Sequence, residues 1–443
     1  MDNLFNELEK RIPKGRVRTR FAPSPTGYMH LGNLRTALYT YMIAKRSGGD
    51  FILRIEDTDR ERYVEGAVEL IYKTLKETGL NYDEGPDIGG PVGPYIQSER
   101  MHIYKAAAEK LVSLGAAYFC FCGKETDKKS DLPAKYDGRC LKLSADEVQK
   151  KLSAGEPYVI RQKMPRTGTT SFNDVVYGKI TVPNDELEDQ ILLKSDGLPT
   201  YNFANVIDDH LMGITHVVRG SEYLSSAPKY NLLYNAFGWE VPVYVHCAPV
   251  MKNATEKLSK RAGDPSYEDL INEGYLKDAI VNYVTLLGWS PGGEREIYSL
   301  KEFVEIFDIK GISKSPAIFD ILKLNHINSE YIRALPEDEF KALARPYIEE
   351  AIENPGINTD EIIPLIQPRL EKFTDIPQHV DFFDKLPDYD TSLYCHKKMK
   401  TDERISLDVL KKLVGIIEGI NPWTQQNIHD TLFELINSMN VKN

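Results

Sequence analysis

The fold is decided by the stretch Val17-Arg18-Thr19-Arg20-Phe21-Ala22-Pro23-Ser24-Pro25-Thr26-Gly27-Tyr28-Met29-His30-Leu31-Gly32-Asn33. It begins with a short β-rich run and passes through a proline-rich turn. Apolar residues then recur with the spacing of a helix, at Leu34, Ala37, Leu38, Tyr41 and Met42. Gly48 and Gly49 end this helix, and residues 51–55 form a nearly continuous apolar run. The order strand, turn, helix, strand predicts an α/β fold with a Rossmann-type parallel sheet.

This order places His30 and Gly32 outside the carboxyl end of a strand, where open parallel sheets bind their ligands. The first turn of a helix has unpaired backbone N–H groups and a partial positive charge, so it attracts phosphates. Gly27 and Gly32 lack a Cβ, which allows a ligand to approach the backbone closely. The same residues would also serve a turn that His30 merely caps, and this segment alone leaves both interpretations open.

A second motif lies far along the chain, at Lys257-Leu258-Ser259-Lys260-Arg261. Residues 253–265 have no clear periodicity, which predicts a loop. A loop with three cations is suited to closing over a triphosphate and to stabilising a leaving pyrophosphate. A solvated lysine-rich surface loop is the alternative.

Composition sets the frame for these motifs. A chain of 443 residues is expected to form about three domains at roughly 150 residues each. It contains no apolar run long enough for a membrane span, no signal-peptide pattern at its N-terminus, and five unevenly spaced cysteines. These features predict a cytoplasmic protein without a disulfide framework. The net charge of -11 leaves nucleic-acid binding open, because binding depends on local fields.

The two motifs resemble the HIGH and KMSKS elements of class I aminoacyl-tRNA synthetases. Residues 20–27, 54–60, 196–201 and 205–210 are more specifically similar to glutamyl-tRNA synthetases, and the resemblance runs from about Val17 to at least Lys323. It implies ATP-dependent ligation of L-glutamate to tRNA(Glu) through a glutamyl-adenylate. It also implies Mg²⁺ with the ATP, tRNA(Glu) as partner and a monomeric protein.

The resemblance also implies site residues. For ATP they are Gly27, His30, Gly32, Asn33, Lys257, Ser259 and Lys260, of which His30, Lys257 and Lys260 are the catalytic ones. For glutamate they are Arg20, Ala22, Ser24, Glu56, Tyr201, Asn205 and Arg219. Arginine suits the substrate carboxylates because its planar fork binds them bidentately, and Glu56 is expected to face the α-ammonium. Arg54 and Asp59 are interpreted as a structural ion pair or a helix cap.

Three cysteines, Cys120, Cys122 and Cys140, fall within a short segment and indicate a structural Zn²⁺. Some relatives of the family described above bind zinc here with a histidine where this chain has Lys142, so the resemblance leaves Tyr136 as the candidate for the fourth ligand. Reduced, half-buried cysteines remain the alternative.

The resemblance predicts four regions. Residues 1–95 and 195–262 form the catalytic domain, and 96–194 an inserted domain that receives the tRNA acceptor end. Residues 263–334 form an all-α linking domain, and 335–443 a helical anticodon-binding region. Many bacterial relatives extend further than Asn443, so this region is expected to be incomplete, whether naturally or by truncation.

Several related activities agree less well with these residues. A glutaminyl-tRNA synthetase usually reads Pro-Glu-Pro where this chain has Pro23-Ser24-Pro25. A short paralogue that glutamylates a tRNA base lacks the helical third. A small-molecule nucleotidyltransferase needs no second motif, and a non-catalytic relative would not keep both motifs. A form that also charges tRNA(Gln) stays open, as does the need for tRNA in glutamate activation.

Overall fold

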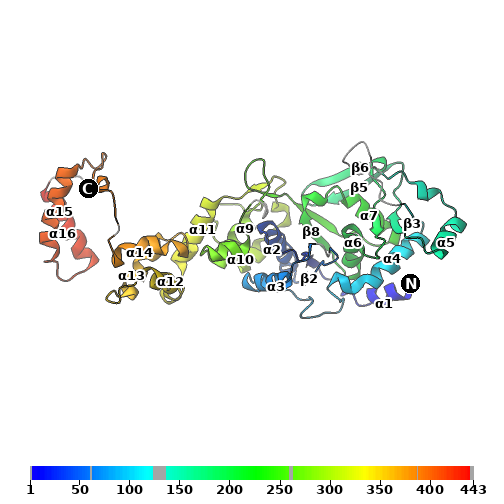
Figure 1. The fold of residues 1–443 in the computed structure, drawn as a ribbon, viewed down its shortest axis with the longest axis horizontal. Helices are drawn as coiled ribbons and strands as arrows, with labels where there is room; N and C mark the ends of the chain where they lie inside the picture. Colours follow the sequence, from blue (N-terminus) through cyan, green and yellow to red (C-terminus); the bar gives the residue numbers. More distant parts are fainter. Residues whose placement is uncertain (1, 60–61, 123–135, 259–262, 387, 440–443) are drawn as a thin grey trace. The chain divides into compact units, whose positions relative to one another are not determined.

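The computed structural model describes residues 2–59, 62–122, 136–258, 263–386 and 388–439. The chain forms two compact units (Figure 1). One comprises residues 1–347 with 360–376, and the other residues 348–359 with 377–443. Ser259, Lys260 and Arg261 of the second motif lie outside the described residues.

The first unit is built on a six-stranded sheet with the strand order β2-β1-β8-β9-β5-β6. Its strands are β1 (Arg18–Phe21), β2 (Asp50–Leu53), β5 (Thr169–Asp174), β6 (Gly178–Pro183), β8 (His216–Gly220) and β9 (Val243–Cys247). Every neighbouring pair is parallel except β5 and β6. The predicted α/β fold with a mainly parallel sheet is confirmed.

Adjacent residues of each strand point to opposite sides of the sheet. Apolar side chains on both sides are buried because helices cover both faces. Phe51 and Val218 pack on one side and Ile52 and Val217 on the other. The first side holds α2 (Leu31–Arg46) and α9 (Lys277–Leu286), and the second holds α4 (Met101–Ser113), α6 (Tyr201–Leu211) and α7 (Ala227–Phe237). Figure 1 shows α2 and α6 on opposite sides of β8.

The segment predicted as an insertion, 96–194, contributes to two sheets. Strands β3 (Ala117–Cys120), β4 (Val159–Gln162) and β7 (Ile191–Leu193) form a separate antiparallel sheet, accompanied by α5 (Ala145–Ser153). Strands β5 and β6 instead extend the main sheet, where Asp174 pairs with Tyr244 of β9. The insertion is therefore not a separate body along its whole length.

After residue 263 the chain is mainly helical, as the sequence predicts. The remaining helices of the first 334 residues are α1 (Asp2–Glu9), α3 (Ala67–Glu77), α8 (Tyr267–Asn272), α10 (Leu300–Ile306) and α11 (Ile321–Ala334). Two short strands, β10 (Val250–Met251) and β11 (Ala317–Ile318), pair in parallel. Arg35 of α2 donates to the carbonyls of Ala248 and Leu287, so this buried cation ties the sheet to the helical region.

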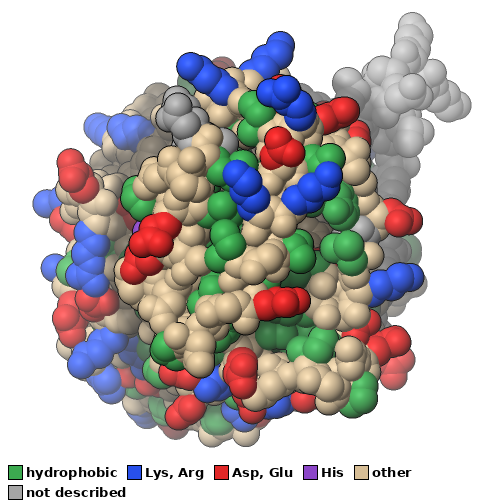
Figure 2. Space-filling view, turned by 90° about the vertical axis from the view of Figure 1, so that its left-hand side faces the viewer, with side chains coloured by type: hydrophobic (Ala, Val, Ile, Leu, Met, Phe, Trp, Pro, Cys, Tyr) green, Lys and Arg blue, Asp and Glu red, His purple; other side chains and the backbone are tan. Residues whose placement is uncertain are grey.

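The last part of the chain contains α12 (Glu337–Ala351), α13 (Thr359–Ile366), α14 (Ile376–Asp384), α15 (Glu403–Ile417) and α16 (Gln425–Ser438). This confirms the predicted helical C-terminal region. Figure 2 looks onto the side where α15 and α16 are drawn, and its surface mixes hydrophobic side chains with charges of both signs. Among the described helices, none has both the length and the apolar character that crossing a bilayer requires.

Candidate active site

A cavity of about 270 Å³ opens where β1 and β8 end. These neighbouring strands form the switch point of the sheet, because β1 continues through α2 to β2 on its other side. The cavity is lined by Arg20, Phe21, Ala22, Pro23, Ser24, Thr26, Asn33, Thr36, Glu56, Arg62, Tyr201, Val218, Arg219, Gly220, Glu222 and Tyr223. Every predicted glutamate-site residue except Asn205 is in this lining.

Arg219 is a buried cation with two unused donors. Its Nε donates to Nε2 of His246 at 3.2 Å, whereas Nη1 and Nη2 have no hydrogen-bond partner among the described residues. The rings of Tyr223, Tyr230 and Tyr244 lie 5.6, 4.5 and 5.3 Å from the guanidinium carbon. Aromatic faces attract a cation but accept no strong hydrogen bond from it. The guanidinium is therefore ready to bind an anion.

Arg20 differs from Arg219 because the protein already supplies it with partners. Its Nε donates to Asp209 at 2.9 Å and its Nη1 to the carbonyl of Val218 at 3.2 Å. Its charge faces the cavity but is partly balanced there.

Glu56 is the buried anion of the cavity. Its Oε1 accepts from Nη2 of Arg54 at 2.9 Å, and Arg54 also binds Asp209 at 2.8 Å. Burial raises the pKa of Glu56, although Arg54 and Arg20 lower it in part. Its hydrogen bonds from described residues all go to Oε1, so Oε2 remains as an acceptor. Arg54 thus forms a structural ion pair with Glu56 and Asp209, one of the two roles that the sequence left open for it.

Asn205 is buried one helical turn beyond Tyr201 and is not part of the lining. Its Nδ2 donates to the carbonyl of Tyr201 at 2.7 Å. This bond within α6 uses the side chain to hold the helix, which is why it does not reach the cavity.

His30 both caps α2 and keeps a donor free. Its Nδ1 accepts from the N–H of Gly32 at 3.0 Å, which places the ring proton on Nε2. Nε2 is buried and has no partner within hydrogen-bonding geometry in the described chain. Burial lowers the pKa of His30, whereas the Leu258 carbonyl and Asp264 raise it in part. Capping and ligand binding, the two roles left open above, are therefore compatible.

Steric contacts explain why glycine occupies position 32. A Cβ on Gly32 would lie 3.2 Å from Nδ1 of His30, closer than ordinary packing allows. Gly27 has a φ of 111°, a conformation that residues with a side chain rarely adopt.

The chain on either side of residues 259–262 is held next to the start of α2. Leu258 is buried, and its N–H donates to Val250 at 3.0 Å. Ser266 forms a β-bridge with His30, and Tyr267 N–H donates to Met29 at 3.2 Å. The two motifs are therefore neighbours in space. The Lys257 side chain is exposed and does not line the cavity.

The sequence reasoning missed several residues of this site. Glu222 and Tyr223 line the cavity directly after β8, and their position just beyond a strand end is a signal that would have found them. Arg62 and Thr36 also line it. His246 contacts Arg219 from β9, and no local pattern marks it.

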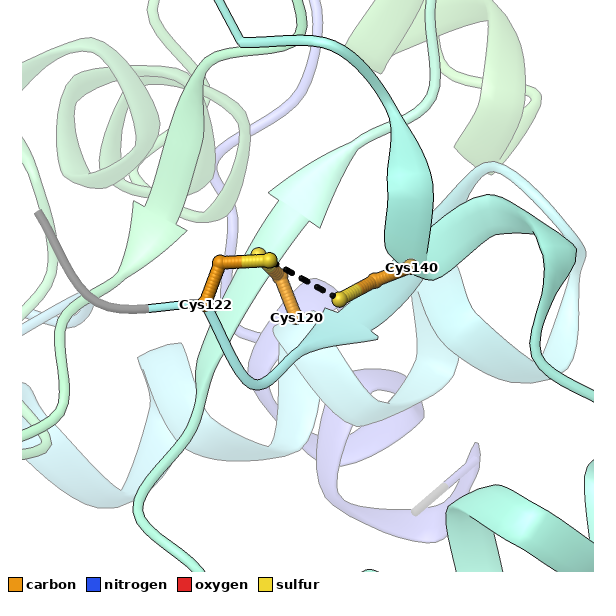
Figure 3. Close-up of side chains that lie close together, drawn as sticks. All are labelled: Cys120, Cys122 and Cys140. Carbon is orange, nitrogen blue, oxygen red and sulfur yellow. Dashed lines mark hydrogen bonds between the residues drawn. The ribbon is translucent and has the colours of Figure 1, made fainter. Parts of the chain in front are cut away.

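The three cysteines of the insertion converge (Figure 3). Their Sγ atoms all lie within 4.8 Å of one another, and those of Cys122 and Cys140 are 3.3 Å apart. The Tyr136 hydroxyl lies 3.4 Å from Sγ of Cys120 and accepts from the N–H of Cys140 at 3.1 Å. Three thiols and one phenol thus meet at one point.

Comparison with protein families decides the relationship. The model of the catalytic domain of class I tRNA synthetases (E and Q) matches residues 16–326. The chain belongs to this family. A model of an anticodon binding domain matches residues 339–443. The resemblance found in the sequence is thereby confirmed.

The sequences of individual glutamate–tRNA ligases are similar to this chain along nearly its whole length. The glutamate–tRNA ligase of Clostridium acetobutylicum is 60% identical over 96% of this chain and 90% of its own length. The glutamate–tRNA ligase of Clostridium botulinum is 58% identical over 97% of this chain and 90% of its own length. The crystal structure of a glutamate tRNA ligase from Elizabethkingia meningosepticum, in complex with its amino acid, is 36% identical with a TM-score of 0.82. It aligns with 96% of this chain and 91% of its own.

Proposed function

We propose that this protein ligates L-glutamate to tRNA(Glu) in an ATP-dependent reaction with a glutamyl-adenylate intermediate. The observation that carries the choice of substrate is Arg219, which lines the same cavity as Glu56 and whose two buried Nη groups have no hydrogen-bond partner among the described residues. An amino acid with an acidic side chain complements this pair. Its carboxylate accepts both Nη–H groups, and its ammonium is attracted by Glu56.

Glutamine fits the same site less well. Its amide offers one oxygen and no negative charge, so a buried guanidinium would keep an unmatched charge and an NH₂ group would face its donors. Arg20, Ala22, Ser24 and Tyr201 complete the pocket in this proposal. Asn205 supports it from behind by holding the backbone of Tyr201.

In this proposal, ATP binds at the beginning of α2. The Nε2–H of His30 supplies a buried donor for a phosphate or ribose oxygen, and the helix start with Gly27, Gly32 and Asn33 receives the nucleotide. Lys257, Ser259 and Lys260 close over the phosphates, and Mg²⁺ accompanies them. The contacts of Leu258 and Ser266 beside His30 support this arrangement.

The reaction needs no protein nucleophile. The α-carboxylate of glutamate attacks the α-phosphorus in line and pyrophosphate leaves. The 2′-hydroxyl of the terminal tRNA ribose then attacks the acyl carbon and AMP leaves. The protein contributes positioning and charge stabilisation. Neutral His30 donates a hydrogen bond and transfers no proton.

The rest of the chain binds tRNA in this proposal. Residues 96–194 receive the acceptor end, 263–334 link the two ends, and 335–443 bind the anticodon. The enzyme acts as a monomer in the cytoplasm.

The cysteine cluster fits a structural Zn²⁺ held by Cys120, Cys122, Cys140 and Tyr136. Three converging thiols are the donor set that zinc prefers. Metal analysis of the purified protein and of Cys140→Ser tests this. One equivalent of zinc per chain that is lost in the variant supports the site. A zinc-to-protein ratio near zero in both proteins would refute it.

The function itself is tested by pyrophosphate exchange and by charging, with tRNA(Glu) present. Glutamate-dependent exchange and glutamyl-tRNA formation are expected. The absence of both with tRNA present would contradict the proposal. A parallel reaction with tRNA(Gln) shows whether the form is discriminating.

A further inference from the structure

Behind Arg219 lies a continuous chain of buried polar groups from three strands. Nε of Arg219 on β8 is 3.2 Å from Nε2 of His246 on β9. Nδ1 of His246 is 2.7 Å from Oδ2 of Asp174 at the end of β5. The side chains of His246 and Asp174 are fully buried. Neither residue lines the cavity, so both act on a ligand only through Arg219.

The donors and acceptors of this chain fix one tautomer of His246. Arg219 Nε–H can only donate, so Nε2 of His246 must accept. The Asp174 carboxylate can only accept, so the ring proton must sit on Nδ1. Burial, with a contribution from Arg219, lowers the pKa of His246, whereas Asp174 raises it in part, and the net lowering favours this neutral form.

Asp174 is itself held firmly. Its Oδ1 accepts from the N–H groups of Val176 and Tyr177 at 2.9 and 2.8 Å. Its Oδ2 also accepts from the backbone N–H of His246 at 3.1 Å. These partners are all donors, which fixes the position of the carboxylate.

The result is a guanidinium with one directional contact. Within the described chain, His246 is the hydrogen-bond partner of Arg219, and the surrounding tyrosine rings provide attraction without fixing the rotation. Using Nε for this contact leaves the Nη1–Nη2 edge for a ligand. That edge presents two parallel N–H donors, which can bind a carboxylate bidentately.

We propose that Asp174 and His246 are positioning residues that orient Arg219 for the carboxylate of the amino-acid substrate. This inference rests on the proposed function and adds two residues to its specificity site. It also gives β5, the strand that the predicted insertion contributes to the main sheet, a part in substrate recognition.

The test compares His246→Leu with His246→Gln in tRNA-dependent pyrophosphate exchange. Leucine fills the space without an acceptor, whereas the glutamine amide oxygen reaches the position of Nε2 and can accept from Arg219. His246→Leu should raise the KM for glutamate at least about tenfold and leave the KM for ATP unchanged. His246→Gln should recover most of the loss. His216→Gln serves as the matched control. His216 lies on β8, beside the strand of His246, and its ring contacts Thr215.

An unchanged KM for glutamate in folded His246→Leu would overturn the inference, as would equal increases for glutamate and ATP. The tautomer is measured independently of any variant, from the ¹⁵N shifts of the His246 ring in the wild-type protein. A proton on Nδ1 is expected. A proton on Nε2 would overturn the inference, because Nε2 could then not accept from Arg219. A wild-type protein that shows no glutamate-dependent exchange would refute the proposed function. The ¹⁵N shifts of the His246 ring would still show whether His246 accepts from Arg219.

Discussion

Arg219 carries the chemistry of this site because its two Nη groups have no hydrogen-bond partner among the described residues. The side chain is only 5% exposed, and its closest neighbours are tyrosine rings and a neutral histidine. Arg20 and Arg54 are equally buried but bind Asp209 directly. The difference separates two cations that carboxylates of the protein already bind from one whose Nη groups are available to a ligand.

Replacing Arg219 should therefore separate activity from stability. Arg219→Met removes the carboxylate partner, and we expect kcat/KM for glutamate to fall on the order of a thousandfold. Because the Nη groups of Arg219 have no hydrogen-bond partner among the described residues, their removal should change the free energy of unfolding by no more than about 1 kcal/mol. Pyrophosphate exchange and thermal denaturation measure the two effects.

Arg295→Met is the control for this comparison, because Arg295 is exposed and forms a surface pair with Glu302. It should change neither quantity. A loss of stability in Arg219→Met that parallels its loss of activity would contradict the account.

Acidification should weaken glutamate binding through His246. The groups that face its ring are Asp174, Arg219, Glu222 and Tyr244. The pKa of His246 lies below its ordinary 6.5, mainly because the ring is buried. The unfolded chain therefore takes up this proton first, and the contribution of His246 to stability falls as the pH drops below 6.5. Once the folded ring gains a proton on Nε2, it opposes Arg219 Nε–H.

We therefore expect the KM for glutamate to rise as the pH falls through the lowered pKa of His246. The KM for ATP, measured over the same range, is the internal control. Parallel changes in both KM values would assign the effect to another group.

At the scale of elements, the start of α2 depends on a fit between two residues. In Gly32→Ala the new Cβ would lie 3.2 Å from Nδ1 of His30 and displace the ring. Alanine favours the helix by about 1 kcal/mol over glycine, which offsets part of the strain. We expect the exchange rate to fall at least about tenfold, the effect typical of a misplaced reacting group, with little change in stability.

Gly415→Ala is the matched control, because Gly415 lies in α15 and a Cβ there meets no atom within 4 Å. It should raise stability slightly and leave the rate unchanged. An equal rate in Gly32→Ala would show that the position of His30 does not matter.

The sequence predicts those elements whose signal is local. The periodicity of residues 34–42 predicts α2, and the strand-end rule together with the family resemblance places Arg20, Glu56 and Arg219 near one edge. The strand predicted over 51–55 ends at Leu53 in the structure, because Ile55 pairs with Ile96 and no longer with β1. Such boundaries depend on tertiary contacts.

Contacts between distant segments are beyond such reasoning. Asp174 reaches His246 only because β5 joins the main sheet beside β9, and no pattern within residues 169–174 announces that pairing. Asn205 shows the converse, because its residue type fits a binding site while its actual bond is to its own helix.

At the scale of the whole molecule, a chain with a net charge of -11 must bind a polyanion through local positive surfaces. Phosphate contacts weaken as salt rises, because counterions compete for them. The glutamate site is buried, and its ion pairs are screened much less. We expect the KM for tRNA(Glu) to rise steeply between low and physiological salt while the KM for glutamate changes little. Aminoacylation at several salt concentrations measures both values. Equal sensitivity would place the amino-acid site in solvent.

The central claim is that Arg219 makes the cavity specific for a carboxylate side chain. It is tested most directly by pyrophosphate exchange with ATP and tRNA(Glu), in which glutamate and glutamine are compared for the wild type and for Arg219→Met. The account predicts strong exchange with glutamate, little with glutamine, and loss of this preference in the variant. Equal use of the two amino acids by the wild type, or an unchanged preference in the variant, would contradict it.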